Sequence, residues 1–91
     1  MLELEWDEEK RRANIRKHGL DFADAEHLDW DEATYIEDTR FPYPEPRFWA
    51  FALWKRRLHL VAFCRRGNKV RIISFRRANR KEVKRHGRQT Q

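Results

Sequence analysis

The sequence has little cysteine, little glycine and no long apolar run, and each shortage excludes a class of protein. The single cysteine, Cys64, rules out an intramolecular disulfide and favours a reducing cytosol, and its apolar neighbours are typical of a core residue. Three glycines are too few for a glycine-rich phosphate loop. No segment approaches the roughly 20 apolar residues of a membrane span, and no signal-peptide pattern is present. We therefore expect a soluble, cytoplasmic protein without a membrane partner.

Metal-binding patterns are also missing. The sequence contains neither a cysteine pair nor a His-Glu-x-x-His motif. Asp29, Asp31 and Glu32 are close together, but their spacing is not that of a calcium loop, and we expect them to be solvated. The sequence therefore predicts no metal site and no cofactor.

Acidic residues are scarce in the second half of the chain. Residues 46–91 hold one acidic and fifteen basic side chains, whereas residues 1–45 hold fourteen acidic and six basic ones. Such an excess of positive charge costs self-repulsion unless a polyanion binds. The basic residues concentrate near the C-terminus: Arg71, Arg76, Arg77, Arg80, Lys81, Lys84, Arg85 and Arg88. We expect this segment to bind RNA; two solvated faces of opposite charge, with no partner, are the alternative.

Aromatic side chains are plentiful, and 91 residues predict one small domain, spanning 1–91, with a thin core. Apolar periodicity and the capping residues Asp7, Gly19, Asp21 and Asn79 set the expected elements. These are a strand at 2–6, helices at 8–18 and 22–28, strands at 33–38, 47–54, 58–64 and 69–75, and a helix at 80–86. The order β-α-α-β-β-β-β-α predicts an α+β fold with an antiparallel sheet and helices packed on one face.

Local signals mark the connections between the later strands. Three prolines between residues 42 and 46 break regular structure and predict a loop. Short turns are expected at 55–57 and 66–68. In the strand that follows, simple alternation sets two residues on each face: Val70 and Ile72 on one, Ile73 and Phe75 on the other.

Arginines around the strand at 69–75 supply the positive charge that a metal-independent nuclease needs. Such an enzyme stabilises the charge on phosphorus with cations, and in RNA the 2′-OH is itself the nucleophile. The arginines are Arg66, Arg71, Arg76 and Arg77. If the hairpin closes at Gly67-Asn68, Arg66 and Arg76 approach the same end of the sheet, so we expect both to contact the scissile phosphate. For each arginine taken singly, holding the RNA backbone without catalysis is the alternative.

Candidates for proton transfer are few. His18 follows Lys17 at the end of the expected helix and titrates near neutral pH, although a cationic helix cap is the simpler interpretation. Glu82 can act as a base, but its spacing from Asn79 fits a capping box, which we prefer. The aromatic Trp49 can stack on an unpaired base, yet in a chain this short a core role is the more common one.

Two groups of motifs resemble the BrnT toxin family. The first comprises Trp6-Asp7-Glu8-Glu9-Lys10, Asn14, Lys17-His18-Gly19 and Phe22-Ala23-Asp24-Ala25; the second comprises Arg66-Gly67, Arg71-Ile72-Ile73-Ser74-Phe75-Arg76-Arg77-Ala78 and Glu82. Together they cover both ends and nearly the whole length. The chain departs from the family pattern at Glu45-Pro46-Arg47, at Ala52, at Asn79 and at Phe63-Cys64-Arg65, where the family usually has Tyr-Thr-Glu.

The resemblance implies a ribonuclease toxin of a type II toxin–antitoxin module with a RelE-like fold. Such a toxin cuts RNA, restrains translation and growth, and is held inactive by a cognate BrnA-like antitoxin, expected to be of the ribbon-helix-helix type. Operator DNA is then a partner only through the antitoxin. Two other interpretations stay open: a non-catalytic nucleic-acid-binding module, and a regulatory domain whose basic face meets an acidic protein.

Overall fold

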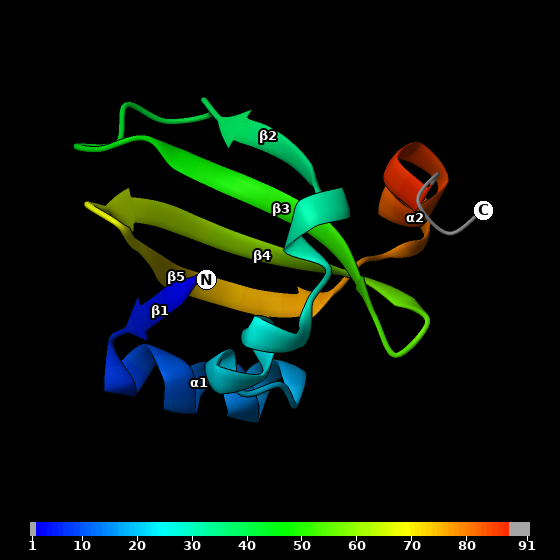
Figure 1. Ribbon diagram of the computed structural model, residues 1–91, viewed down its shortest axis with the longest axis horizontal. Helices are drawn as coiled ribbons and strands as arrows, with labels where there is room; N and C mark the ends of the chain where they lie inside the picture. Colours follow the sequence, from blue (N-terminus) through cyan, green and yellow to red (C-terminus); the bar gives the residue numbers. More distant parts are fainter. Residues whose placement is uncertain (1, 88–91) are drawn as a thin grey trace.

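A five-stranded sheet forms the centre of the molecule (Figure 1). The computed structural model describes residues 2–87. Its strands are β1 (Glu3–Trp6), β2 (Thr34–Asp38), β3 (Arg47–Trp54), β4 (Arg57–Arg66) and β5 (Lys69–Arg77); its helices are α1 (Glu8–His18), η1 (Phe22–His27), η2 (Trp30–Glu32) and α2 (Arg80–His86). The predicted α+β fold and element order are confirmed. The segment expected as a helix at 22–28 is a 3₁₀ helix, and the short 3₁₀ helix η2 was not predicted.

The sheet is mixed, so the expectation of a wholly antiparallel sheet was wrong. Its strand order is β1-β5-β4-β3-β2, and β1 runs parallel to β5. The other three pairings are antiparallel. Strand direction was beyond the reach of the sequence argument, because alternation of apolar and polar residues shows a strand without showing which neighbour it joins.

The sheet buries one face and leaves much of the other accessible. On the first, which we call the covered face, Phe22, Ala25 and Trp30 from the 3₁₀ helices pack against Val61 and Phe75. A smaller cluster of Phe51, Leu58 and Leu60 lies on the second face, which we call the open face.

Helix α2 belongs to the open face, where the His86 ring stacks on Phe51 at a centroid distance of 4.3 Å. Helices therefore contact both faces of the sheet, whereas the sequence analysis had predicted helices on one face. The physical reason is the direction of β5: it carries the chain past the end of the sheet, and Ala78 then packs with the open-face cluster before α2 begins.

The side chain of Asn14 attaches α1 to the edge of the sheet. Strand β1 pairs with β5 only as far as Ile72. Beyond that point, the Asn14 amide donates to the Phe75 carbonyl at 2.7 Å and accepts from the Phe75 N–H at 3.0 Å. Asn14 thus continues the ladder where β1 ends, satisfying two backbone groups that burial would otherwise leave unpaired. This contact directs the last turn of α1, including His18, toward the end of β5.

A β-bulge at Ile73 changes which side of β5 carries each residue. Ala62 pairs with Ser74, but the next residue, Phe63, pairs with Ile72, so Ile73 is an extra residue in β5. Simple alternation across this strand was therefore the wrong expectation. Because of the extra residue, Val70, Ile72 and Phe75 are all buried in the covered core. The same shift brings Arg71 to the open face together with Arg76.

Candidate functional site

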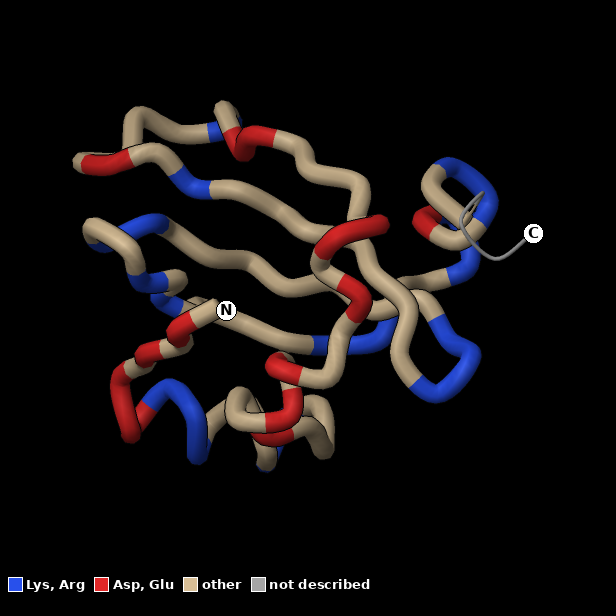
Figure 2. Tube along the Cα trace, viewed as in Figure 1, with Lys and Arg blue, Asp and Glu red and all other residues tan. Residues whose placement is uncertain are grey.

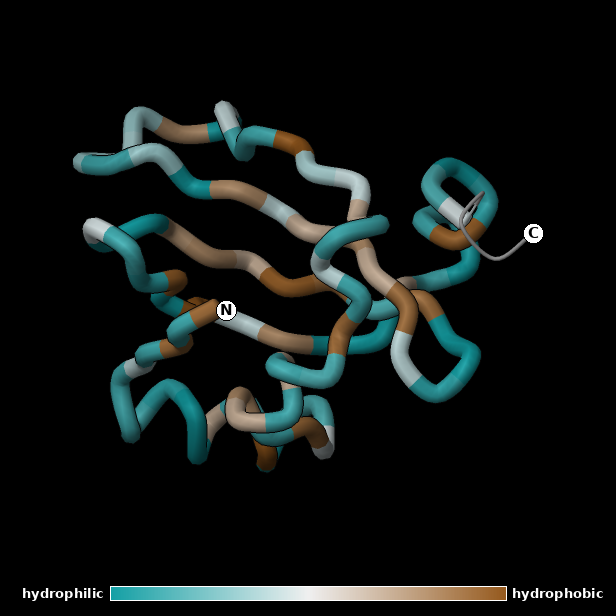
Figure 3. Tube along the Cα trace, viewed as in Figure 1, coloured by the Kyte–Doolittle hydropathy of each residue, from teal (hydrophilic) through white to brown (hydrophobic). Residues whose placement is uncertain are grey.

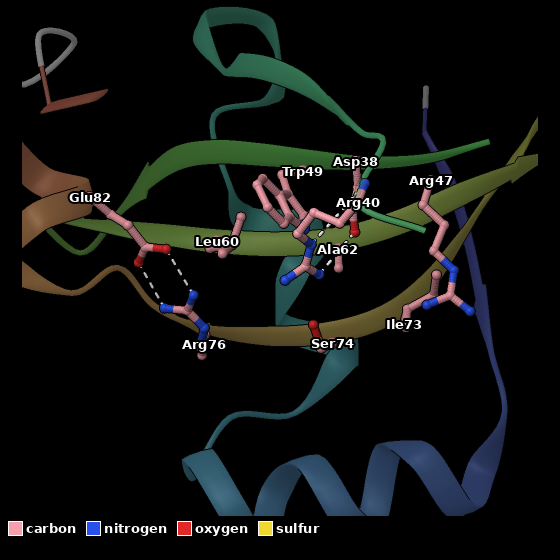
Figure 4. A pocket seen from close by; sticks show the side chains of 10 residues that line it. All are labelled: Asp38, Arg40, Arg47, Trp49, Leu60, Ala62, Ile73, Ser74, Arg76 and Glu82. Carbon is pink, nitrogen blue, oxygen red and sulfur yellow. Dashed lines mark hydrogen bonds and ion pairs between the residues drawn. The ribbon is translucent and has the colours of Figure 1, made fainter. Parts of the chain in front are cut away.

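The open face of the sheet carries two adjoining hollows lined by arginines. The first, which we call the Arg76 hollow, has a volume of about 330 Å³ (Figure 4). The second, the Arg66 hollow, has a volume of about 260 Å³. Both are lined by Arg47 and Ile73, so they form one continuous depression across the face.

One wall of the Arg76 hollow is an arginine–carboxylate pair between β5 and α2. Arg76 donates two hydrogen bonds to Glu82, each of 2.8 Å, and Figure 4 shows the paired side chains facing each other. Glu82 also accepts from the Asn79 N–H at 2.8 Å, while the Asn79 side chain accepts from the Glu82 N–H, which confirms the predicted capping box. The hydrogen bonds from Arg76 are the main cause that lowers the pKa of Glu82. Glu82 is therefore a weak base that holds Arg76 in place.

The opposite wall of the Arg76 hollow holds Arg40 over an aromatic ring. The Arg40 guanidinium donates to Asp38 at 2.9 and 3.0 Å and lies 4.9 Å from the centroid of Trp49. Asp38 is buried and also accepts from the Tyr43 hydroxyl at 3.1 Å. These bonds, those from Arg40 foremost, lower the pKa of Asp38 to about 2. Asp38 is thus a fixed anion at physiological pH, and it orients Arg40 across the Trp49 face.

Sequence reasoning missed Arg40 and Asp38 and placed Trp49 in the core. Phe48 does join the covered core, but its neighbour Trp49 is only partly buried and faces the Arg76 hollow. The available signal was the alternation within the strand at 47–54, since adjacent residues face opposite sides. Asp38 and Arg40 lacked such a signal, because Asp38 is the last residue of β2 and Arg40 lies in the loop before the prolines.

Two arginines that line the Arg66 hollow are also paired with carboxylates. Arg66 lies 2.9 Å from Glu45, and Arg71 lies 2.7 Å from Glu5 of the neighbouring strand β1. The Cys64 thiol donates to Glu45 at 3.3 Å. Burial, followed by that bond, raises the pKa of Cys64, which is consistent with the expected core cysteine and with an unreactive thiol.

Arg66 and Arg76 lie at opposite ends of the β4–β5 hairpin, so the expectation that they share one end was wrong. Arg66 pairs with Lys69 beside the turn, whereas Arg76 pairs with Leu60 far along the hairpin. At about 3.3 Å per residue, the two positions are separated by roughly 20 Å, too far for both to bind one phosphate. The sequence argument failed because it did not count the strand positions between the turn and Arg76. Arg47, shared by both hollows, lies between the two ends.

His18, the last residue of α1, lies close enough to Arg76 for their charges to interact, but it lines neither hollow. It is partly buried in the last turn of α1. Burial lowers its pKa below the usual 6.5, and the positive charges of Lys17 and Arg76 lower it further. His18 is consequently neutral at physiological pH and suited to accept a proton. Lys17 is exposed beside it.

The remaining predicted RNA-binding residues are exposed at the α2 end of the sheet (Figure 2). They are Arg77, Arg80, Lys81, Lys84 and Arg85, and within residues 2–87 none of their side chains has a carboxylate partner within 4.0 Å. Arg88, predicted with them, lies outside the described residues. These cations retain their full charge for an external partner.

Within residues 2–87, no three His, Cys, Asp or Glu side chains come together in a way that could hold a metal ion. No helix of the same range has the length and apolar character needed to cross a membrane.

The fold and the arginine-lined face are those of a small α+β protein with a surface suited to polyanions. A family model described as "Ribonuclease toxin, BrnT, of type II toxin-antitoxin system" matches residues 6–82. The crystal structure of the Brucella abortus ribonuclease toxin BrnT is similar to this chain, with a TM-score of 0.67 and 33% sequence identity, covering 88% of this chain and 100% of that one. No sequence among curated proteins matches. The chain belongs to the BrnT family of ribonuclease toxins, as its motifs had indicated.

Proposed function

We propose that this protein is a metal-independent endoribonuclease toxin that cleaves RNA in the Arg76 hollow. The observation that carries the proposal is the composition of this hollow, which has Arg76 and Arg40 on opposite walls and the ring of Trp49 beside Arg40. His18 does not line the hollow, but it is close enough to Arg76 for that charge to lower its pKa. A phosphodiester bound to these arginines would also reach His18, and so meet the base and the two cations that the reaction requires.

The proposed reaction uses the RNA as its own nucleophile. Neutral His18 takes the proton of a 2′-OH, the oxygen attacks the adjacent phosphorus, and the bond to the 5′-oxygen of the next nucleotide breaks. The leaving oxygen takes up a proton, for which Lys17 and the protonated His18 are the candidate donors. The products are a 2′,3′-cyclic phosphate and a 5′-OH, and DNA, which lacks the 2′-OH, is not cut.

Arg76 and Arg40 have the roles of stabilising charge on the phosphorane. Although each already binds a carboxylate, a guanidinium has five N–H donors in a planar fork. Arg76 uses its two terminal nitrogens toward Glu82, and Arg40 uses Nε and one terminal nitrogen toward Asp38, so each keeps donors for phosphate. Glu82 and Asp38 act as positioning residues. Arg66 and Arg71 in the second hollow, and the cations of α2, hold the RNA backbone on either side.

The proposed partner is a cognate BrnA-like antitoxin of the ribbon-helix-helix type. Type II toxins are paired with protein antitoxins, and the open face offers arginines that carboxylates of such a partner can bind. We propose that the antitoxin covers the Arg76 hollow and α2, blocking RNA, and that operator DNA binds only the antitoxin. The free toxin then acts in the cytoplasm by degrading RNA, which halts translation and growth.

Purified protein incubated with RNA in EDTA tests the enzymatic proposal. Cleavage to cyclic-phosphate ends, with DNA of the same sequence left intact, is expected. Activity that EDTA abolishes, or equal cleavage of DNA, contradicts the mechanism. Binding of RNA without any cleavage would instead support a non-catalytic nucleic-acid-binding module. The observation in favour of that alternative is the pairing of Glu82 with Arg76, which makes Glu82 a weak base. Arg12→Ala is a suitable arginine control, because Arg12 lies on α1, away from both hollows, and pairs with Glu8.

A further inference from the structure

The turn between β3 and β4 has a backbone geometry that its residues do not favour. Lys55 and Arg56 both have positive φ angles, 52° and 64°. Two-residue hairpin turns of this kind are normally built from Asn-Gly or Asp-Gly, because Gly lacks the Cβ that disfavours the left-handed region, and Asn and Asp tolerate that region better than other residues. The two residues between β3 and β4 are nevertheless both cationic, and Arg57 follows directly. Local strain of this kind is a reason to look for a function.

The cations of this turn have no carboxylate partner in the part of the chain that the structure describes. Lys55, Arg56 and Arg57 are exposed, and among residues 2–87 no carboxylate lies within 4.0 Å of any of them. Lys55 lies over the ring of Trp54, with 4.5 Å between Nζ and the ring centroid. Three successive positive charges repel one another, so this turn loses both conformational and electrostatic stability unless an external anion binds.

The turn is adjacent to the basic end of the molecule. The Ala78 N–H donates to the Leu58 carbonyl at 2.9 Å, and Arg77 is the pairing partner of His59. The start of β4 therefore runs beside the connection from β5 to α2, and Figures 1 and 2 show the turn and α2 at the same end of the sheet. The turn, Arg77 and the cations of α2 thus form one positively charged end, next to the Arg76 hollow.

We propose that the Lys55–Arg57 turn is a second phosphate-binding element, which holds the RNA backbone beyond the Arg76 hollow. This inference rests on the proposed ribonuclease function. The turn would act on substrates long enough to reach it and would leave the chemistry of a dinucleotide unaffected. Its contribution would be affinity and salt dependence, since backbone contacts by lysine and arginine release counterions from the RNA.

RNA fits this turn better than an acidic protein does. A protein interface is centred on buried apolar or aromatic side chains, with charges at its rim. Within residues 2–87 the exposed large apolar side chains are Leu2, Ile15, Tyr35, Phe41 and Val83, and none belongs to the turn. Figure 3 shows the turn as a hydrophilic segment. Phosphate contacts need only accessible positive charge.

The double substitution Lys55→Asn with Arg56→Gly tests the proposal without disturbing the fold. Asn-Gly is the preferred sequence for this turn, so thermal stability is expected to be unchanged or higher. Affinity for a single-stranded RNA of about 12 nucleotides, within the usual range of site sizes, is measured across salt concentrations. We expect affinity to fall roughly tenfold and the slope of log K against log salt to become shallower by about 1.4, or about 0.7 per lost contact. Cleavage of a dinucleotide is expected to stay at the level of the unmodified protein.

The outcomes separate this inference from the function on which it rests. If the unmodified protein cleaves no RNA, the proposed function fails. If it cleaves RNA and the double variant keeps the same affinity and salt slope, the turn is not a phosphate-binding element. An unchanged RNA affinity with weakened antitoxin binding would assign the turn to the protein interface instead. The matched control is Arg12→Gln with Arg16→Gln, which removes two cations from α1 and is expected to leave the affinity nearly unchanged.

Discussion

Two groups of cations in this protein differ in how they are held. On the open face, Arg40, Arg66, Arg71 and Arg76 each bind a carboxylate of the same chain. At the α2 end, the cations of the helix and of the β3–β4 turn have no such partner within residues 2–87. Pairing reduces net charge but fixes geometry, whereas unpaired charge attracts a polyanion from a distance without orienting it. We propose that the paired arginines of the Arg76 hollow serve catalysis, that Arg66 and Arg71 hold the RNA backbone in a fixed position, and that the unpaired cations capture RNA.

The strongest test of this comparison removes Arg76. Arg76→Ala is expected to lower the rate of RNA cleavage by about 10²–10³-fold, as the loss of a transition-state donor does. Arg76→Lys should recover little, because lysine cannot make the paired bonds to Glu82 and still reach phosphate. Single-turnover cleavage is the measurement, with Arg12→Ala as the control. The comparison fails if Arg66→Ala, at the far end of the hairpin, lowers the single-turnover rate by the same factor.

A smaller effect is expected when Arg76 remains but its partner loses charge. Glu82→Gln preserves the capping box, in which Gln is also acceptable, and leaves Arg76 less firmly oriented. We expect the cleavage rate to fall about tenfold with little change in melting temperature, since an oriented group loses rate when its position loosens. If Glu82 were the general base, the loss would match that of Arg76→Ala, and the positioning role would have to be abandoned.

Removing an unpaired cation should affect binding and leave turnover intact. Lys84→Ala is expected to weaken RNA affinity a few-fold and to make the salt slope shallower by about 0.7, the share of one phosphate contact. Saturating cleavage should remain at its original rate. A fluorescence titration at several salt concentrations, paired with single-turnover kinetics, distinguishes the two effects. A slower rate of RNA cleavage at saturating protein would assign Lys84 a catalytic role and contradict this prediction.

The smallest expected change is in the titration of His18. Burial and the charges of Lys17 and Arg76 lower its pKa below 6.5 in the folded protein. Because the proposed base must be neutral, cleavage should decline as pH falls through that lowered pKa and stay high near neutrality. Arg76→Ala removes one of the lowering charges, so the pKa of His18 should rise. NMR titration measures this shift, and Arg12→Ala should leave the pKa in place; an unshifted His18 in Arg76→Ala would contradict the proposed proximity.

Local signals in the sequence sufficed for several elements. Helix α1 has its predicted bounds because Asp7 caps its start, accepting from the Lys10 N–H at 3.1 Å, and Gly19 ends it at a φ of 73°. The capping box of Asn79 and Glu82 is likewise a three-residue pattern. Such motifs depend only on near neighbours, so a single sequence contains the whole signal.

The features that sequence reasoning missed depend on distant parts of the chain. The parallel pairing of β1 with β5 joins the first strand to the last, and the Asn14–Phe75 contact spans 61 positions. The separation of Arg66 from Arg76 follows from hairpin register, and the hollow between Arg40 and Arg76 forms only when β2 and β5 lie in one sheet. The number of arginines in the sequence predicted a positively charged surface, but three-dimensional pairing decided which arginines meet.

The extra residue at Ile73 has a consequence for how this chain tolerates change in length. Before Ile73, the open-face arginine of β5 stands at an odd-numbered position, Arg71. After Ile73, it stands at an even-numbered position, Arg76. Deleting Ile73 would remove the bulge and leave plain alternation, with Arg71 and Arg76 still together on the open face and Ile72 and Phe75 still together on the covered face. A one-residue deletion at this point is therefore expected to leave both arginines on the open face.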